Sequence, residues 1–385
     1  MSTRTTIEWT DYSFNAIRAD RADGENRVSG HYCEKVSSGC ANCYASRMQP
    51  RFGMPEFGGQ TPLNKRFKHD AALIEVPSPD GVVHLTLNRA LIDKALRSKA
   101  LAGKRVFVCD MSDLFGWWVP DEWIDLHYAL FALRPDVTWQ VLTKRPERMA
   151  EYCFHGVSQN RAGLIAAAAQ PLRKYCPDDN PAIGPLGRGT PGYSWYPLPN
   201  VWAGTSVEDQ PQADQRIIHL LRCPAAVRFL SVEPMLGPVE LEASCGDPYA
   251  ILPGRHWLGP PSQARGMNQG IDWVICGGES GPGARPMHID WARSLRDQCQ
   301  TARVPFFFKQ WGAWLFSPHE TNFYAGVDWA MEQTGSKHPN DRRHMRYSTG
   351  HVAALVGKKK AGRVLDGRTW DEMPQPKETP DVRGE

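Results

Sequence analysis

The sequence of 385 residues contains no run of 18 or more apolar residues, so it predicts no membrane-spanning helix. Residues 1–9 also lack the apolar core of a secretory signal peptide. These absences argue against an integral membrane protein and a secreted protein. We therefore expect a cytoplasmic protein with no membrane partner.

Neither the net charge nor internal repeats of the sequence indicate a class of function. Lys and Arg total 45 and Asp and Glu total 42, so the net charge of +3 offers no overall electrostatic argument for nucleic-acid binding. No long internal repeat is present. No Gly-x-Gly-x-x-Gly sequence follows the first predicted strand, which argues against a dinucleotide-binding sheet.

The ten cysteines do not indicate a disulfide framework, because a chain of this length in a reducing compartment keeps its thiols reduced. Several of them lie in apolar or helical contexts and are predicted to be ordinary buried thiols. These are Cys109, Cys223, Cys276 and Cys299.

Three further cysteines lie within eleven residues, in the order Cys33-x6-Cys40-x2-Cys43. A C-x2-C pair lets two thiolates converge on one metal, and the longer Ser/Gly-containing loop lets a third thiolate fold back. Free cysteines are usually buried as small apolar residues, not gathered in a polar loop. Metal or cluster binding is therefore favoured over three unconnected thiols.

Short apolar runs alternate with amphipathic helical patterns through much of the chain. This alternation predicts βα units and a mainly parallel sheet. We expect an α/β fold that forms a full or partial parallel (β/α) barrel, with the three-cysteine loop after its first strand. The predicted strands are residues 7–17, 106–110, 138–142, 201–204, 227–230, 271–276 and 304–308. The predicted helices are residues 44–52, 89–100, 120–133, 146–152, 213–222 and 290–303.

Several segments interrupt the alternation. Residues 18–30 are polar and predict an inserted loop before the cysteines, and residues 53–80 predict irregular structure. Insertions rich in Pro and Gly are expected at about 156–200, with one helix near 161–175, and at about 244–270.

The chain of 385 residues is longer than a single hydrophobic core usually supports. We expect a barrel-like catalytic domain at residues 1–315 and an irregular C-terminal extension at 316–385, packed on the barrel and disordered at its end. The run Lys358 to Lys360 in this extension predicts a solvated face or a phosphate contact.

Charged residues follow the ends of the predicted strands. In βα barrels the carboxyl-terminal rim is where catalytic and binding groups are placed, so these residues predict one shared site. Ser206-Val-Glu208 and Ser231-Val-Glu233 are near-repeats at successive strand ends, which suggests equivalent rim positions. The strand-end residues are Asp113, Lys144, Arg145, Glu208, Asp209, Glu233, Glu279 and Lys309.

Three thiolates have two main uses. With His31 as a fourth ligand they complete a structural Cys3His zinc site. Alternatively they hold three irons of a [4Fe–4S] cluster and leave the fourth iron open to an external chelate, such as the amino and carboxylate groups of S-adenosylmethionine.

Several stretches resemble a family of phage and prophage proteins of poorly defined function, often called three-Cys-motif proteins. That family in turn resembles radical S-adenosylmethionine enzymes, whose usual cysteine spacing is C-x3-C-x2-C. The similar stretches are Ile7-Glu-Trp-Thr-Asp11, Val36-Ser-Ser-Gly-Cys-Ala-Asn-Cys-Tyr-Ala45, Met111-Ser-Asp-Leu-Phe115, Leu142-Thr-Lys-Arg-Pro-Glu-Arg-Met149, Phe229-Leu-Ser-Val-Glu-Pro-Met-Leu-Gly-Pro238, Gly277-Gly-Glu-Ser-Gly-Pro-Gly-Ala-Arg-Pro286, Phe306-Phe-Phe-Lys-Gln-Trp-Gly312 and the segment from Gly357 to Trp370.

The resemblance implies a partial βα barrel, a [4Fe–4S] cluster on Cys33, Cys40 and Cys43, and S-adenosylmethionine as second cofactor. It also implies a small electron donor of the ferredoxin or flavodoxin type, a nucleic-acid or nucleotide substrate, and a phage-encoded partner protein. Residues expected to contact S-adenosylmethionine are Tyr44, Ser112, Asp113, Thr205, Ser206 and Glu208. Residues expected to serve catalysis are Glu208, Glu233, Glu279, Lys144 and Lys309.

Two other functions remain open at this point. One is a zinc-stabilised Cys3His protein that binds nucleic acid without redox chemistry. The other is a metal-free barrel hydrolase in which Glu208 and Glu233 act as paired carboxylates.

Overall fold

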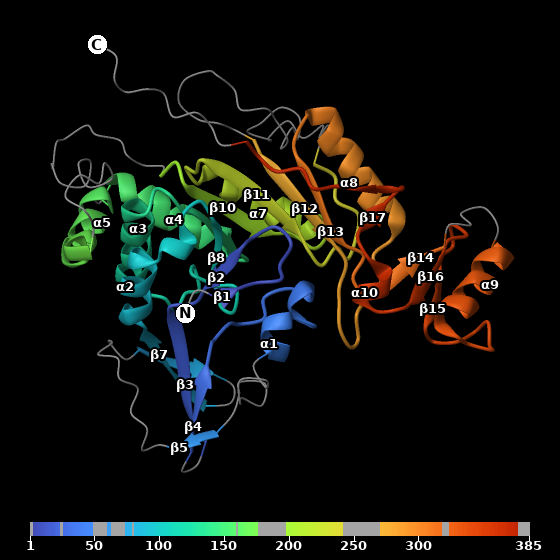
Figure 1. Ribbon diagram of the computed structural model, residues 1–385, viewed down its shortest axis with the longest axis horizontal. Coiled ribbons are helices and arrows are strands. Elements are labelled where there is room, and N and C mark those ends of the chain that lie inside the picture. Colours follow the sequence, from blue (N-terminus) through green and yellow to red (C-terminus); the bar gives the residue numbers. More distant parts are fainter. Residues whose placement is uncertain are drawn as a thin grey trace.

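The computed structural model describes residues 3–23, 26–48, 60–62, 74–78, 81–158, 161–175, 198–241, 270–317 and 323–375 (Figure 1). The predicted insertion at 244–270 lies almost wholly outside these residues, as do residues 176–197 of the other insertion and the final residues 376–385. No helix among the described residues is long and apolar enough to cross a membrane.

The largest sheet in the described part of the chain has the strand order β1-β2-β8-β9-β10-β11-β12-β13. β1 pairs antiparallel with β2, and every other neighbouring pair is parallel. The predicted α/β class with a mainly parallel sheet is therefore confirmed. The sheet is open, with β1 and β13 as its edge strands, so a full barrel is not shown. The strands are Thr3–Arg4, Tyr12–Phe14, Arg105–Val108, Thr138–Thr143, Val201–Ser206, Val227–Val232, Trp273–Gly277 and Phe306–Gln310.

The helices that alternate with these strands lie close to their predicted positions. α7 begins at Gln210, three residues earlier than expected, because the Asp209 side chain caps it by accepting a hydrogen bond from the Gln212 amide (3.2 Å). The predicted helix near 161–175 is confirmed as α5 (Arg161–Ala169) and a 3-10 turn. The other helices are α1 (Tyr44–Met48), α2 (Arg89–Arg97), α3 (Asp121–Leu133), α4 (Pro146–Ser158) and α8 (Ile289–Ala302).

Both faces of the parallel sheet are buried, which explains why its strands are continuous apolar runs. Alternate residues of each strand pack against the helices, as Val201 and Ala203 of β10 do. The intervening residues form an aromatic cluster on the opposite, inner face, together with Trp9 from the loop before β2. This cluster contains Trp9, Phe107, Trp202, Val227, Phe229, Trp273, Ile275 and Phe307.

The prediction of an inserted loop at 18–30 is wrong. β3 (Ile17–Asp23) and β4 (Asn26–Gly30) belong to a five-stranded antiparallel sheet in the order β5-β4-β3-β7-β6, which projects below the parallel sheet in Figure 1. β5 (Gln60–Pro62) and β6 (Ile74–Ser78) also replace part of the irregular structure expected at 53–80, and β7 spans Gly81–Leu87. The cysteine loop therefore follows a hairpin and not the first strand directly.

The expectation of an irregular tail is also wrong. β14 (Trp314–Phe316), β16 (Val352–Leu355) and β15 (His344–Arg346) form an antiparallel sheet, with α9 (Phe323–Thr334) packed on β16. The chain then passes through α10 (Lys358–Ala361) and the short pair β17 (Val364–Leu365) and β18 (Arg368–Thr369).

The C-terminal segment covers the free edge of β13. The Phe308 amide donates to the Trp370 carbonyl (2.9 Å), and the Trp273 indole donates to the Glu372 carbonyl (2.9 Å). Lys358 also forms an ion pair with Glu8 (3.2 Å), close to the other edge of the sheet. The extension is thus part of the folded core, not an appended tail.

Candidate functional site

The segment from Tyr32 to Tyr44, which carries the three cysteines, is fixed on the carboxyl-terminal ends of the parallel strands. Four of its side chains contact residues that follow four different strands. The contacts are Tyr44 with the Asp110 carbonyl after β8 (2.6 Å), Glu34 with Arg145 after β9 (3.4 Å), Ser37 with Glu208 after β10 (2.9 Å), and Asn42 with Glu279 after β12 (3.0 Å). The structure therefore places the cysteine segment and the predicted strand-end residues in one site.

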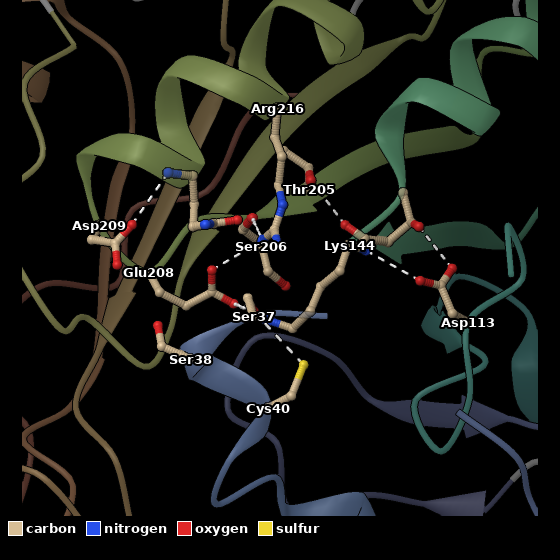
Figure 2. A network of polar contacts seen from close by, with 12 residues as sticks. Ser37, Ser38, Cys40, Asp113, Lys144, Thr205, Ser206, Glu208, Asp209 and Arg216 are labelled. Atoms are coloured by element: carbon tan, nitrogen blue, oxygen red, sulfur yellow. Dashed lines mark hydrogen bonds and ion pairs between the residues drawn. The ribbon is translucent and has the colours of Figure 1, made fainter. Parts of the chain in front are cut away.

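Glu208 is fully enclosed, with none of its surface exposed. Its carboxylate forms ion pairs with Lys144 and with Arg216 (3.0 Å) and accepts a hydrogen bond from Ser37 (Figure 2). Arg216 also donates to the Ser206 carbonyl (2.9 Å). Glu208 therefore joins β10, the following helix α7 and the cysteine segment.

The pKa of Glu208 lies below its ordinary value. Burial alone raises the pKa of the carboxyl, but the charges of Lys144 and Arg216 and the hydrogen bond from Ser37 lower it further than burial raises it. The carboxylate consequently stays ionised at neutral pH. An enclosed, ionised and fully partnered carboxylate is not available to activate water, which disfavours the paired-carboxylate hydrolase.

We expect Glu208→Gln to lower the free energy of unfolding by about 3 kcal/mol at neutral pH, since it leaves two largely buried cations without their counter-charge. The folded-state pKa is depressed, so this stabilisation is present above the ordinary pKa of 4.5 and is lost as pH falls through the lower folded value. Urea unfolding of both proteins across this range should show the difference shrinking in acid. Glu151→Gln on the exposed side of α4 is the control. A difference that grows in acid would contradict the assignment.

Gly39 lets the cysteine segment approach Glu208 closely. A Cβ atom at this position would lie 2.5 Å from Oε1 and 2.8 Å from Cδ of Glu208, and still closer to Cγ. These distances are below ordinary van der Waals contact. Because the Glu208 side chain is held by Lys144 and Arg216, it cannot move aside easily. The small residue between Ser38 and Cys40 is therefore required by the packing of the site.

Glu279 fixes the other end of the cysteine segment. Its side chain is 4% exposed and accepts hydrogen bonds from Asn42 and from Arg285 (2.6 and 2.9 Å). Arg285 also donates to the Ser38 carbonyl (2.9 Å). Burial raises the pKa of Glu279, but the hydrogen bonds from Arg285 and Asn42 lower it further, so the net shift is downward. Like Glu208, Glu279 acts here as an ionised anchor for the loop.

Asp113 is buried, and its carboxylate is engaged in hydrogen bonds with neighbouring residues of the protein. Its carboxylate accepts hydrogen bonds from the Thr143 hydroxyl (2.7 Å), the Phe115 amide (3.0 Å) and the Lys144 amide (3.2 Å), and it pairs with Arg145 (3.0 Å). These contacts fix the ends of β8 and β9 to each other. Asp113 thus positions Arg145, which reaches Glu34 beside Cys33.

Glu233 and Lys309 form the remaining ion pair of the strand ends, at 2.8 Å. Glu233 also accepts a hydrogen bond from Gln310 (3.1 Å), and a Cβ at Gly277 would contact it at 3.2 Å. The side chains of Glu233 and Lys309 are 18% and 13% exposed, so solvent reaches this pair, unlike Glu208. The pKa of Tyr44 is raised chiefly by desolvation, and the negative charge of Glu233 adds to this shift.

The three thiols interact electrostatically. Although solvent reaches Cys33, the protein packed around it raises the pKa of its thiol, Asp113 adds to this, and Arg145 opposes it. The thiols of Cys43 and Cys40 raise the Cys33 pKa further, as nearby ionisable groups do. Cys40 is buried and its Sγ lies 3.7 Å from the Ser37 hydroxyl. The predicted ligands therefore lie in one neighbourhood.

The geometry does not suit a single zinc ion at this place. Among the described residues, the three cysteine sulfurs do not fall within 4.8 Å of one another, whereas ligands of one tetrahedral ion lie closer together. His31 is buried, and its ring nitrogens contact the Ile17 carbonyl (3.0 Å) and Arg18 (2.8 Å). Burial lowers the pKa of His31 to about 3, and Arg18 contributes. The Cys3His alternative is disfavoured for both reasons.

Tyr44 begins α1 directly after the last cysteine. Its side chain is 43% exposed, and its hydroxyl donates to the Asp110 carbonyl. Desolvation by the surrounding protein raises the Tyr44 pKa well above its ordinary value, and the charges of Asp110 and Cys43 raise it further. The hydroxyl therefore remains protonated, and part of the ring faces solvent at the strand ends.

Two of the residues expected to contact S-adenosylmethionine are enclosed by the protein. Thr205 is fully buried and donates to the Thr143 carbonyl (2.9 Å), and it alternates with the inward-facing residues of β10. Ser206 alternates with Thr205 and so lies on the inner face of β10, but it is only 5% exposed. Ser112 is half-buried, and its hydroxyl oxygen is enclosed without a hydrogen-bond partner among the described residues.

Comparison with protein families matches residues 4–374 to a family described as a protein of unknown function (DUF5131). The chain belongs to this family. The match extends from β1 to the segment on the edge of β13, and so includes the cysteine segment and all the strand ends. No curated protein and no solved structure is significantly similar to the chain.

Several residues that build the site of this DUF5131 protein were not predicted from the sequence. Ser37, Gly39 and Asn42 lie between the cysteines. The only sequence feature that could have indicated them is that this segment is polar and contains a glycine. Arg216 and Arg285 lie on a helix and in a loop. The only sequence feature that could have indicated these two arginines is a basic residue six or eight positions after a strand-end glutamate. That spacing is too common to be informative.

Proposed function

We propose that the protein is an iron–sulfur enzyme of the radical S-adenosylmethionine type, with Cys33, Cys40 and Cys43 as cluster ligands. The observation that carries this proposal is the attachment of the cysteine segment to the ends of four strands, β8, β9, β10 and β12. An enzyme that directs a reactive group at one substrate atom needs its cofactor held rigidly beside the substrate site. The carboxyl ends of parallel strands are where such sites are built.

The residues present fit a cluster better than a single ion. In a cluster each thiolate binds a different iron, so the sulfurs are spaced more widely than around one ion; among the described residues the three thiols do not form a set whose ligand atoms all lie within 4.8 Å of one another. Although desolvation and Asp113 raise the pKa of Cys33, the Arg145 cation opposes that shift, and the Ser37 hydroxyl lies 3.7 Å from Sγ of Cys40. When bound, a [4Fe–4S] cluster supplies the electron that cleaves S-adenosylmethionine to methionine and a 5′-deoxyadenosyl radical.

Glu233 and Lys309 form a partly exposed charge pair at the carboxyl-terminal ends of β11 and β13. A methionine group carries an ammonium and a carboxylate, which are complementary to these two side chains. We therefore assign amino-acid recognition to Glu233 and Lys309. Asp113 and Glu208, by contrast, hold the strand ends and the cysteine segment in position through protein contacts.

An exposed aromatic ring beside the cysteine segment supports a nucleobase-containing substrate. Trp117 is 54% exposed, and its indole donates to Glu34 (2.9 and 3.0 Å). Exposed aromatic rings stack on bases without requiring a particular sequence. We propose a nucleotide or nucleic-acid substrate, with Trp117 as its stacking surface. A ferredoxin- or flavodoxin-type donor in the cytoplasm and a phage-encoded partner protein belong to the same proposal.

Anaerobic reconstitution with iron and sulfide tests this function. We expect about four iron and four sulfide per chain, a brown protein, and formation of 5′-deoxyadenosine when S-adenosylmethionine and a strong reductant are added. Lys309→Met should keep the iron but lose most of the cleavage. Colourless protein with zinc alone would support the structural-metal alternative, and an iron-loaded protein inert toward S-adenosylmethionine would reject the proposed reaction.

A further inference from the structure

A second group of potential metal ligands lies away from the cysteines, between α8 and the C-terminal sheet. His288 is the N-cap residue of α8, and Asp290 lies in its first turn. His351 directly precedes β16. Among the described residues, this is the one set of three His, Cys, Asp or Glu side chains whose ligand atoms lie within 4.8 Å of one another. The proposed function does not use it.

The two imidazoles converge on one carboxylate oxygen. Oδ2 of Asp290 lies 3.6 Å from Nδ1 of His288 and 3.9 Å from Nδ1 of His351. Ligand atoms at about 2.0–2.1 Å from a tetrahedral zinc ion lie about 3.4 Å apart. The observed separations exceed this value by a few tenths of an ångström, which small rotations of the side chains remove.

We propose that His288, Asp290 and His351 bind one zinc ion that joins the C-terminal sheet to the barrel-like part of the chain. Two imidazole nitrogens and a carboxylate oxygen are a zinc donor set. The His288 and His351 side chains are 6% and 11% exposed, whereas that of Asp290 is 49% exposed. The buried imidazoles are therefore held in place, and the exposed carboxylate leaves a route for the ion and for a water ligand.

The surroundings hold both rings in their present orientation. The Thr349 hydroxyl lies 3.2 Å from Nε2 of His288 and 2.9 Å from Nδ1 of His351. The ring of Tyr347 packs edge-on against His288, with centroids 4.5 Å apart. The Thr349 contact with His288 is made at Nε2, the ring nitrogen that is not the proposed ligand, as is typical of metal sites, whereas its contact with His351 is made at the proposed ligand atom.

Two existing contacts compete with metal binding. The Thr349 hydroxyl lies within hydrogen-bond distance of Nδ1 of His351 (2.9 Å) and has to turn away when an ion binds there. Nδ1 of His288 accepts a hydrogen bond from the Asp290 amide (3.2 Å), which caps α8. Zinc at Nδ1 replaces this single long hydrogen bond by a coordinate bond. The ion also neutralises the carboxylate, so the exchange favours the zinc-bound state.

The consequence is a zinc-dependent attachment of the C-terminal sheet. His288 and Asp290 belong to the helix after β12, whereas His351 belongs to the turn between β15 and β16. A ligand that binds only the folded arrangement stabilises it in proportion to its concentration and affinity. The site is therefore structural in role and independent of the cysteine chemistry.

Zinc titration of the full-length chain after removal of metal by chelation tests the proposal. The cysteines are removed as competitors in a Cys33→Ser, Cys40→Ser, Cys43→Ser protein, which cannot carry the cluster. We expect this protein to bind one zinc per chain and to gain several degrees in its unfolding midpoint. Asp290→Asn and His351→Ala should each weaken binding at least tenfold and abolish the gain.

His344→Ala on β15 is the matched control, because His344 lies on the same sheet but outside the cluster. His288→Asn retains a capping side chain and separates loss of the ligand from loss of the helix cap. Equal zinc affinity in the triple-serine protein and in its Asp290→Asn and His351→Ala derivatives, or no binding at all, would overturn the proposal. Since the cluster is absent from these proteins, neither result bears on the proposed function.

Discussion

Cys40→Ala is expected to abolish cluster assembly while the protein stays folded, whereas Cys276→Ala is expected to retain the iron. Cys40 lies in the segment fixed on the strand ends, beside Ser37, and is one of three proposed ligands. A site with two thiolates cannot hold the cluster stably. Iron and sulfide per chain after anaerobic reconstitution, together with the visible spectrum, measure the difference.

The matched control follows from the position of Cys276. Its thiol is completely buried on the helix-facing side of β12, where Sγ lies 3.8 Å from the sulfur of Met235 and 4.0 Å from that of Met287. Burial, followed by the charge of Glu233, raises its pKa, so it remains a neutral thiol. Its replacement by alanine should cost about 1–2 kcal/mol of unfolding free energy through the small cavity it leaves.

The opposite pattern would reject the assignment. If Cys40→Ala kept its iron, the ligands would have to lie elsewhere. If Cys276→Ala lost iron without a comparable loss of stability, Cys276 would be connected to the cluster in a way that its buried position does not explain. Circular dichroism of both variants shows whether each is folded before the iron contents are compared.

The sequence predicted the parallel sheet well because its strands are buried on both faces. A strand such as Trp273–Gly277 is then a continuous apolar run with a helix before the next strand, and this pattern is distinctive. The hairpin of β3 and β4 was missed for the opposite reason. Ile17 and Ala19 are its only described apolar contributions to the core, and the residues around them are polar.

The location of the site was also predictable, but its internal contacts were not. Strand ends of parallel sheets meet at one edge, so Lys144, Glu208 and Glu279 could be expected there. Which cation neutralises which carboxylate depends on helix and loop geometry. Glu208 takes Arg216 from the following helix, and Ser37 from 171 residues earlier in the chain, and no local pattern encodes these pairings. The roles of Glu208 and Glu279 as anchors therefore required the structure.

Thr205 shows why the face of the sheet on which each strand residue lies has to be determined for that residue individually. The sequence places Thr205, Ser206 and Glu208 together at the end of an apolar run, and all three were expected to contact S-adenosylmethionine. In the structure Thr205 and Ser206 alternate along β10 and so lie on opposite faces of the sheet, and the Thr205 hydroxyl donates to Thr143 at the end of β9. A strand boundary uncertain by one residue reverses such an assignment.

Gly39→Ala is the most direct test that the cysteine segment must approach Glu208 closely. The added methyl would overlap a side chain that Lys144 and Arg216 hold in place, so the loop has to retreat (Figure 2). We expect loss of most of the bound iron after anaerobic reconstitution and a decrease of about 1–3 kcal/mol in unfolding free energy.

Ser38→Ala provides the control, since Ser38 is the adjacent residue and is exposed, and only its backbone carbonyl contacts Arg285. It should bind as much iron as the unaltered chain. Gly39 has no backbone strain that favours glycine, so its replacement tests the close approach alone. Full iron content in Gly39→Ala would show that the thiols reach the cluster without this contact, and the rigid placement of the cysteine segment would then not be needed for assembly.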